Sequence, residues 1–137
     1  SEMCIRDSSK ALCEKNAASE GVASRCVFQH GDAKQLDFPD ESFDVVISNY
    51  VYHNVMGADM QKLLLESLRV LKKGGVFALN DDMKQKMYGD MEDFAQKLRD
   101  MGYEEVRLVD TAQEAFGAHR RAAMMMLGSS RLLVGRK

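Results

Sequence analysis

Two short stretches decide the fold, Gly-Asp-Ala at residues 31–33 and Ser-Phe-Asp-Val-Val-Ile-Ser-Asn at residues 42–49. Residues 43–48 are apolar and rich in β-branched side chains without strict alternation, which is typical of a parallel strand covered on both faces. The segment between the two stretches is polar and holds the single proline, Pro39, so it is predicted to be a loop. We therefore expect an acidic turn, a central buried strand and a polar strand end to follow one another closely.

Helices and strands alternate on both sides of this strand. Upstream, Ser9 is a candidate N-cap for a helix over residues 9–19 that stops at Gly21, and residues 26–28 are a candidate short strand. Downstream, Asp59 can cap a helix that ends in Lys72-Lys73, with Gly74 just beyond it. A second buried strand is predicted over residues 76–79.

The last third of the chain continues this pattern. Asp90 and Asp93 resemble a capping box, and apolar side chains recur at helical spacing from there until Gly102. A strand is predicted over residues 105–109, a helix or loop over residues 111–127, and a closing strand over residues 130–134. This order of elements predicts a doubly wound α/β sheet.

Composition argues against several classes of protein. The chain has 137 residues, 45% of them hydrophobic, and a formal net charge of −2, so it lacks the basic surplus on which nucleic-acid binders rely. Its three cysteines lack the spacing of a zinc site and are odd in number, which favours reduced thiols. The sequence contains neither a signal peptide nor an apolar run of about 18 residues. We therefore expect a cytoplasmic protein with no nucleic-acid partner.

The stretches at 31–33 and 42–49, with Leu-Lys-Lys-Gly-Gly-Val-Phe at residues 71–77, resemble class I S-adenosylmethionine-dependent methyltransferases of the type 11/25 kind. The resemblance covers residues 9–137. It implies a Rossmann-like sheet with strand order 3-2-1-4-5-7-6, in which the last two strands form an antiparallel hairpin at one edge. This sequence offers candidates for strands three to seven only, which leaves the strand over residues 43–48 without a neighbour on one side.

Compared with the family, the 137 residues lack a glycine-rich motif. They contain no Gly-x-Gly-x-Gly turn, which in the family holds the methionine part of the cofactor, so we interpret residues 9–137 as the C-terminal part of a methyltransferase domain. Residues 1–8 resemble a translated sequencing adapter and are interpreted as non-native. In the alternative interpretation Asp7 ends a second strand, where the family places an acidic residue for the ribose hydroxyls.

The resemblance also assigns cofactor contacts to four further residues. It implies that the Asp32 carboxylate accepts a hydrogen bond from the adenine amino group and that the Ala33 backbone N–H donates to a ring nitrogen. Ser48 and Asn49 end the central strand, where the family places contacts to the methionine moiety and to the substrate. The alternative is purely structural: Asp32 caps the turn at Gly31, and Ser48 and Asn49 form a strand-end turn.

His53 is the candidate catalytic residue. It follows the central strand closely, and a histidine side chain ordinarily titrates near pH 6.5, so it can accept a proton from an oxygen or nitrogen nucleophile at neutral pH. The alternative is a structural histidine, because in-line methyl transfer can proceed by positioning alone. Asn80-Asp81-Asp82 follows the strand over residues 76–79 and could line a substrate opening. Two adjacent acids are weak evidence for a cation site, so no metal is predicted.

These features predict methyl transfer from S-adenosylmethionine to a small-molecule acceptor by an intact parent enzyme, with weak or absent activity in these 137 residues alone. The alternative is a non-catalytic accessory or binding module that completes its sheet by pairing with another chain. Some full-length proteins with a similar second half carry a membrane anchor, so the cytoplasmic expectation applies to the present residues only. The sequence predicts no oligomeric state.

Overall fold

The computed structural model of the protein describes residues 10–116 and 127–137. The chain divides into two compact units, Ser1–Asp32 and Ala33–Lys137, which are described separately. The predicted non-native segment 1–8, including Asp7, and most of the predicted helix or loop over residues 111–127 lie outside the described residues.

The N-terminal unit is helical. Helix α2 spans Lys10–Ser19 and is followed by a 3₁₀ turn at Ala23–Arg25. Gly21 ends the helix with a positive φ of 68°, as its sequence position predicts. The predicted strand at residues 26–28 is wrong: these residues form no ladder, and the side chain of Val27 is 90% exposed. A strand needs a partner for its backbone groups, and no described segment provides one here.

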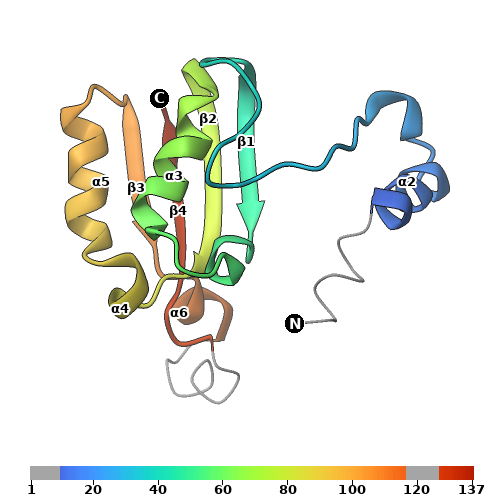
Figure 1. The fold of residues 1–137 in the computed structure, drawn as a ribbon. Helices are drawn as coiled ribbons and strands as arrows, with labels where there is room; N and C mark the ends of the chain where they lie inside the picture. Colours follow the sequence, from blue (N-terminus) through green and yellow to red (C-terminus); the bar gives the residue numbers. More distant parts are fainter. Residues whose placement is uncertain (1–9, 117–126) are drawn as a thin grey trace. The chain divides into compact units, whose positions relative to one another are not determined.

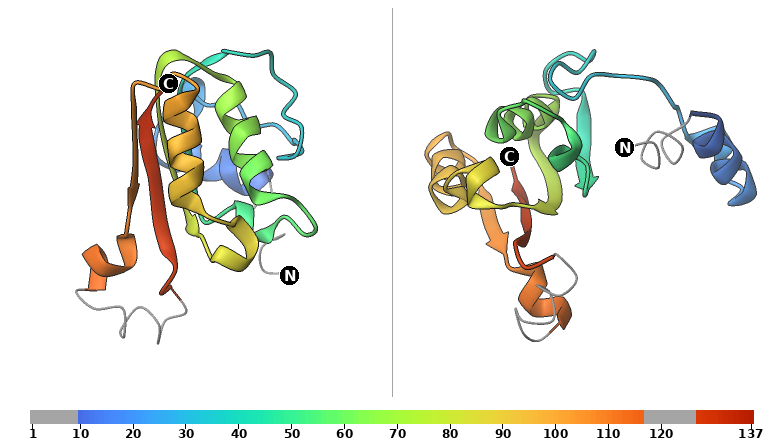
Figure 2. Two further views of the ribbon diagram at one scale, coloured as in Figure 1. Left: turned by 90° about the vertical axis from the view of Figure 1, so that its left-hand side faces the viewer. Right: turned by 60° about the horizontal axis from the view of Figure 1, so that its bottom comes forward.

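The second unit is a four-stranded mixed sheet covered by helices on one face (Figures 1 and 2). Its strands are β1 (Phe43–Asn49), β2 (Leu71–Asp82), β3 (Glu105–Val109) and β4 (Ser130–Arg136). They lie in the order β1-β2-β4-β3, with β1 parallel to β2, and with β4 antiparallel to both of its neighbours. The predicted α/β class and the antiparallel pair at one edge are confirmed.

Helices α3 (Met60–Arg69) and α5 (Met91–Asp100) pack on the same face of the sheet, against β2 and β3 respectively (Figure 1). Each begins where the sequence predicts, because Asp59 accepts a hydrogen bond from the Lys62 N–H and Asp90 accepts one from the Asp93 N–H. The short helices α4 (Gln85–Tyr88) and α6 (Thr111–Phe116) lie between strands, and Tyr52–Asn54 forms a 3₁₀ turn, η2, after β1.

Two sequence predictions about this unit need correction. Helix α3 ends at Arg69 rather than at Lys72-Lys73, because Leu71 already pairs with Phe43 of β1. Gly74, with φ of 76°, lies within β2 where the register against β1 shifts. Strand β1 is not covered on both faces. In the described part of the chain it pairs only with β2, and Ile47 is 76% exposed.

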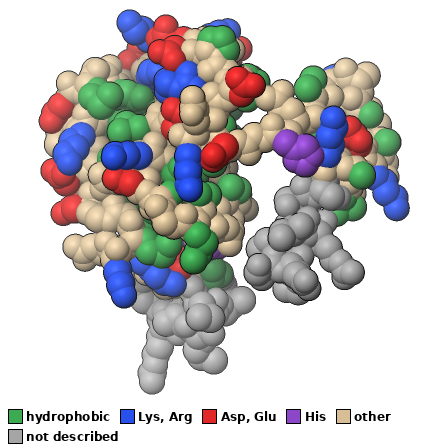
Figure 3. Space-filling view, viewed as in Figure 1, with side chains coloured by type: hydrophobic (Ala, Val, Ile, Leu, Met, Phe, Trp, Pro, Cys, Tyr) green, Lys and Arg blue, Asp and Glu red, His purple; other side chains and the backbone are tan. Residues whose placement is uncertain are grey.

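The hydrophobic core lies between the sheet and its helices. Fully buried leucines and aromatics from every layer meet there: Leu64, Leu68, Phe77, Leu79, Tyr88, Phe94, Leu98 and Leu133. On the outer surface of the helix-bearing face, basic and acidic side chains are interspersed (Figure 3). None of the described helices has the length and apolar character needed to cross a lipid bilayer.

Candidate functional site

An open cavity of about 700 Å³ lies along the carboxyl-terminal halves of β1 and β2. Its wall is mostly apolar and includes Val46, Ile47 and Ala78. Its polar side chains include Ser48 and Asn49 at the end of β1 and Asn80 near the end of β2. Parallel strands β1 and β2 thus bring their carboxyl ends together at the edge where open α/β sheets bind ligands.

A polar network joins the strand ends at this edge. The Asn80 amide donates to Asn49 Oδ1 at 2.8 Å, and the Thr111 hydroxyl lies 3.4 Å from Asn80 Oδ1. Thr111 also bonds Ser130 Oγ at 2.7 Å, and Ser130 Oγ in turn bonds the Tyr50 hydroxyl at 2.5 Å. The network therefore fixes the side chains around the cavity from four separate segments of the chain.

His53 forms a close pair with Asp81 at the same edge. The distance from His53 Nδ1 to Asp81 Oδ1 is 2.6 Å, and the His53 backbone N–H donates to Asp81 Oδ2 at 3.2 Å. Asp81 is fully buried, whereas 34% of the His53 side chain is exposed. The imidazole thus lies between a buried carboxylate and solvent. His53 itself does not line the cavity, although its neighbours Val51 and Tyr52 do.

Two buried tyrosines surround this pair. The Tyr52 hydroxyl bonds Ser67 Oγ at 2.8 Å, and burial raises the pKa of Tyr52. Burial and, after it, the negative charge of Asp81 raise the pKa of Tyr88. Among the described residues, the Tyr88 hydroxyl has no hydrogen-bond partner. Both phenols therefore stay protonated at neutral pH.

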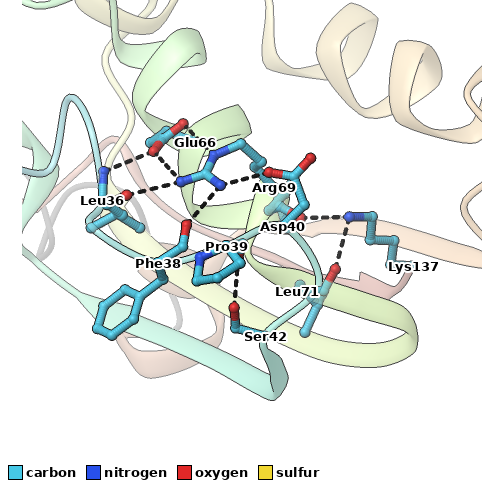
Figure 4. Close-up of polar contacts among 10 residues, drawn as sticks. Leu36, Phe38, Pro39, Asp40, Ser42, Glu66, Arg69, Leu71 and Lys137 are labelled. Atoms are coloured by element: carbon cyan, nitrogen blue, oxygen red, sulfur yellow. Dashed lines mark hydrogen bonds and ion pairs between the residues drawn. The ribbon is translucent and has the colours of Figure 1, made fainter.

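Arg69 holds the loop that forms part of the cavity wall (Figure 4). Its guanidinium donates to the carbonyl oxygens of Leu36 and Phe38, each at 2.9 Å, and pairs with Asp40 at 2.6 Å. Glu66, one turn earlier on α3, accepts from Arg69 and from the Leu36 N–H at 2.7 Å. Leu36 lines the cavity, so this cluster fixes one wall of the cavity to α3.

Glu66→Gln is expected to lower the free energy of unfolding at neutral pH, because it removes the negative charge from this cluster. The Arg69 guanidinium holds the pKa of Glu66 below its ordinary value of 4.5. A carboxyl whose pKa is lowered by folding stabilises the protein above the unfolded pKa, and this contribution disappears as pH falls through the folded pKa. We expect the variant to lose about 1 kcal/mol of unfolding free energy at neutral pH. Below pH 4.5 the loss should diminish.

Urea denaturation of both proteins from neutral to acidic pH measures this difference. Glu20→Gln, at an exposed position in the turn that follows α2, is the matched control and should change stability by less than about 0.5 kcal/mol throughout. A Glu66→Gln deficit that stays constant into the acidic range would contradict the assigned pKa direction.

Some of the candidate residues predicted from the sequence line the cavity, and others do not. Ala33, Ser48 and Asn49 line the same cavity. Asp32 is exposed and belongs to the N-terminal unit, of which it is the last residue, and His53 lies in η2 paired with Asp81. Asn80, Asp81 and Asp82 lie inside β2 rather than beyond it.

From the sequence, Asp81 is a residue that could line a substrate opening, but its burial and its pairing with His53 were missed. Phe77, Leu79, Asp81 and Met83 lie two positions apart in the sequence, so they project toward one face in a strand. All four are buried on the face beneath α3 and α5. The sequence signal that could have identified Asp81 is an acidic residue at one of the alternating positions that are otherwise apolar. Such a residue is expected to be buried with the others, and buried acids are almost always paired.

Comparison with known proteins identifies the family. A family model described as a methyltransferase domain matches residues 2–79, more than half of the chain. The chain belongs to this methyltransferase family, and S-adenosylmethionine is the cofactor of the family.

Curated relatives and solved structures agree with the family. The chain is 33% identical to 27-O-demethylrifamycin SV methyltransferase of Amycolatopsis mediterranei, over 74% of this chain and 36% of that protein. It is 30% identical to the uncharacterized methyltransferase YcgJ of Bacillus subtilis, over 85% of this chain and 47% of that protein. The fold matches a SAM-dependent methyltransferase from Aquifex aeolicus with a TM-score of 0.54 at 16% identity, over 92% of this chain and 61% of that one. The chain thus spans between a third and a half of the two curated relatives.

The cavity residues fit an adenosine-containing ligand. Small-molecule sites usually measure roughly 300–1,000 Å³ and combine an apolar wall with a few polar groups, and the cavity beside β1 has both properties. Apolar side chains such as Val46 and Ala78 suit a planar ring, and the amides of Asn49 and Asn80 suit hydroxyl and amino groups.

Proposed function

We propose that the protein containing this chain transfers a methyl group from S-adenosylmethionine to a small-molecule acceptor. The observation that carries the proposal is the cavity at the carboxyl ends of β1 and β2, to which Ala33, Ser48 and Asn49 contribute. The rifamycin-directed relative supports the acceptor class, because its name gives a small molecule as its substrate.

In the proposed reaction four residues contact the cofactor and one accepts a proton. Asp32 and the Ala33 N–H hold the adenine edge, and Ser48 and Asn49 hold the methionine moiety and orient the acceptor. His53 accepts the proton that the acceptor loses. The cofactor supplies an electrophilic methyl group, and the apolar wall excludes water from the reacting atoms. Among the described residues, no group of three or more His, Cys, Asp or Glu side chains is arranged to hold a metal ion.

Calorimetric titration of S-adenosylhomocysteine into the chain tests this assignment. We expect measurable binding, weaker than that of an intact enzyme because the 137 residues contain no Gly-x-Gly-x-Gly turn. Asp32→Ala should weaken binding about tenfold or more, since a hydrogen bond to a charged group contributes about 1.5–3 kcal/mol.

Asp37→Ala is the matched control, because Asp37 is an exposed aspartate of the same loop that does not line the cavity. It should leave the affinity unchanged. Absence of binding at millimolar ligand, or an equal loss in both variants, would contradict the cofactor site.

The second candidate is a non-catalytic module that pairs with another chain. It is favoured by strand β1, whose Val45 and Ile47 side chains are 54% and 76% exposed. An unpaired strand edge is a template for a further strand. The same titration separates the two candidates, because a module without a cofactor site binds no S-adenosylhomocysteine.

A further inference from the structure

We propose that Asp81 is a positioning residue that keeps the proton of neutral His53 on Nδ1, leaves Nε2 free to accept a proton, and so directs the site toward hydroxyl acceptors. This inference rests on the proposed methyl transfer and deepens it by naming the acceptor group. Neither the family assignment nor the relatives supply the role of Asp81.

The geometry of the pair fixes the direction of the hydrogen bond. Asp81 Oδ1 lies 2.6 Å from His53 Nδ1 and also accepts from the Asp82 N–H at 2.7 Å, while Oδ2 accepts from the His53 N–H at 3.2 Å. Two backbone N–H groups thus donate to this fully buried side chain, one to each oxygen, which is the setting of an ionised carboxylate. Since an ionised carboxylate can only accept, Nδ1 carries the proton.

A buried charged pair is an unfavourable way to connect η2 to β2 if the connection is only structural. Removing a carboxylate from water costs several kcal/mol, which the remaining hydrogen bonds must offset. Asp81 nonetheless lies in the apolar row of β2, beside the core residues Phe77 and Leu79. A neutral side chain could connect η2 to β2 without that cost, so we assign the charge of Asp81 to the orientation of the imidazole.

The surroundings of the ring are consistent with this role. The Tyr50 ring lies edge-on to the imidazole, with a centroid distance of 6.3 Å, and the Tyr50 hydroxyl is engaged with Ser130. Together with the bond to Asp81, this contact limits rotation of the ring. About a third of the His53 side chain remains exposed, so a small molecule can reach it.

The acceptor class follows from proton balance. A hydroxyl is a weak nucleophile until it loses its proton, whereas a neutral amine can attack first and lose a proton afterwards. In the proposed step the acceptor oxygen forms a bond to the methyl carbon as the carbon–sulfur bond breaks. The electron pair of that bond stays on sulfur, and the hydroxyl proton moves to His53 Nε2. A base with one fixed, unprotonated nitrogen is suited to this step.

Nitrogen-15 NMR of the histidine rings tests the orientation directly. In the wild-type chain we expect neutral His53 to populate the Nδ1–H tautomer about tenfold or more over the Nε2–H form, as a charge-assisted hydrogen bond would impose. The exposed His30 ring serves as the internal reference and should favour Nε2–H, as the side chain of free histidine does. A wild-type His53 in the Nε2–H form would overturn the proposal without any variant.

Two variants assign the effect to Asp81. Asp81→Asn should remove the tautomer preference. Asp82→Asn should keep it, because the side chain of this neighbouring aspartate pairs with Lys84 at 2.8 Å. A preference that survives in a folded Asp81→Asn protein would contradict the role of Asp81. If Asp81→Asn fails to fold, the wild-type spectrum still decides.

Phenol and its methyl ether, anisole, test the acceptor class when added with S-adenosylhomocysteine. Phenol should shift the His53 Nε2 resonance, anisole should not, and aniline should have a clearly smaller effect. An equal shift with aniline or anisole would overturn the hydroxyl assignment. These outcomes are distinct from failure of the proposed function, which would appear as absent S-adenosylhomocysteine binding while the tautomer signature persists.

Discussion

Gly135→Ala is expected to abolish stable pairing between β3 and β4. Gly135 lies opposite Val106 of β3 and opposite Phe77 of β2. An added methyl group would collide with the Glu105 carbonyl oxygen and would approach the Phe77 ring to 2.9 Å. Because the first obstacle is backbone in a paired strand, relaxation would displace the strand itself. We expect a loss of about 3 kcal/mol or more, at or above the upper end of usual overpacking costs.

Thermal and urea denaturation of the purified chain measure this loss. Gly31→Ala is the matched control, because an added methyl group there meets no atom within 4 Å and Gly31 does not adopt a positive φ. The control should change stability by less than about 0.5 kcal/mol. Equal stability of the two variants would show that the sheet tolerates a side chain at position 135.

Leu64→Ala is expected to lower the free energy of unfolding by about 2–5 kcal/mol. Leu64 lies on the inner side of α3 and is fully buried in the core cluster. Its removal forfeits the burial of three side-chain carbons and leaves a cavity that the surrounding leucines and aromatics fill only in part.

The neighbouring residue provides the control. Leu65 has the same side chain on the same helix, but it is 38% exposed. Leu65→Ala should cost less than about 1 kcal/mol, since it removes less buried area. Urea denaturation of both variants measures the difference. Similar losses at the two positions would contradict the assignment of the inner face of α3.

Local signals in the sequence predicted much of the fold. Asp59 and Asp90 each precede a helix and cap it as expected. Strands at residues 105–109 and near residues 76–79 and 130–134 are confirmed, because their apolar residues are paired and partly or fully buried in the sheet.

The predictions that were wrong depend on contacts between segments that are distant in the sequence. Residues 26–28 have strand-like side chains, but strand formation depends on a neighbour that no local pattern supplies. The exposure of Ile47 has the same origin, because coverage of β1 depends on segments elsewhere in the chain. The end of α3 was misplaced because pairing of Leu71 with Phe43 outweighs the helix-stop signal of Gly74.

The candidate site was predictable only in part. Ser48 and Asn49 follow from the polar end of an apolar strand, and the structure places both at the cavity. The link between His53 and Asp81 spans 28 positions and depends on the register of β1 against β2. Such a contact has no sequence period, because it exists only once the two strands have paired.

The Arg69 cluster gives the cavity wall a dynamic property. One guanidinium, anchored in the last turn of α3, holds the carbonyl groups of Leu36 and Phe38. The loop can therefore move away from the cavity only when that turn frays or the guanidinium releases it. Local opening of a protein proceeds in cooperative units, and these hydrogen bonds would couple the opening of the loop to the fraying of the helix end. Ligand entry past Leu36 would then be timed by the fraying of a helix rather than by the loop alone.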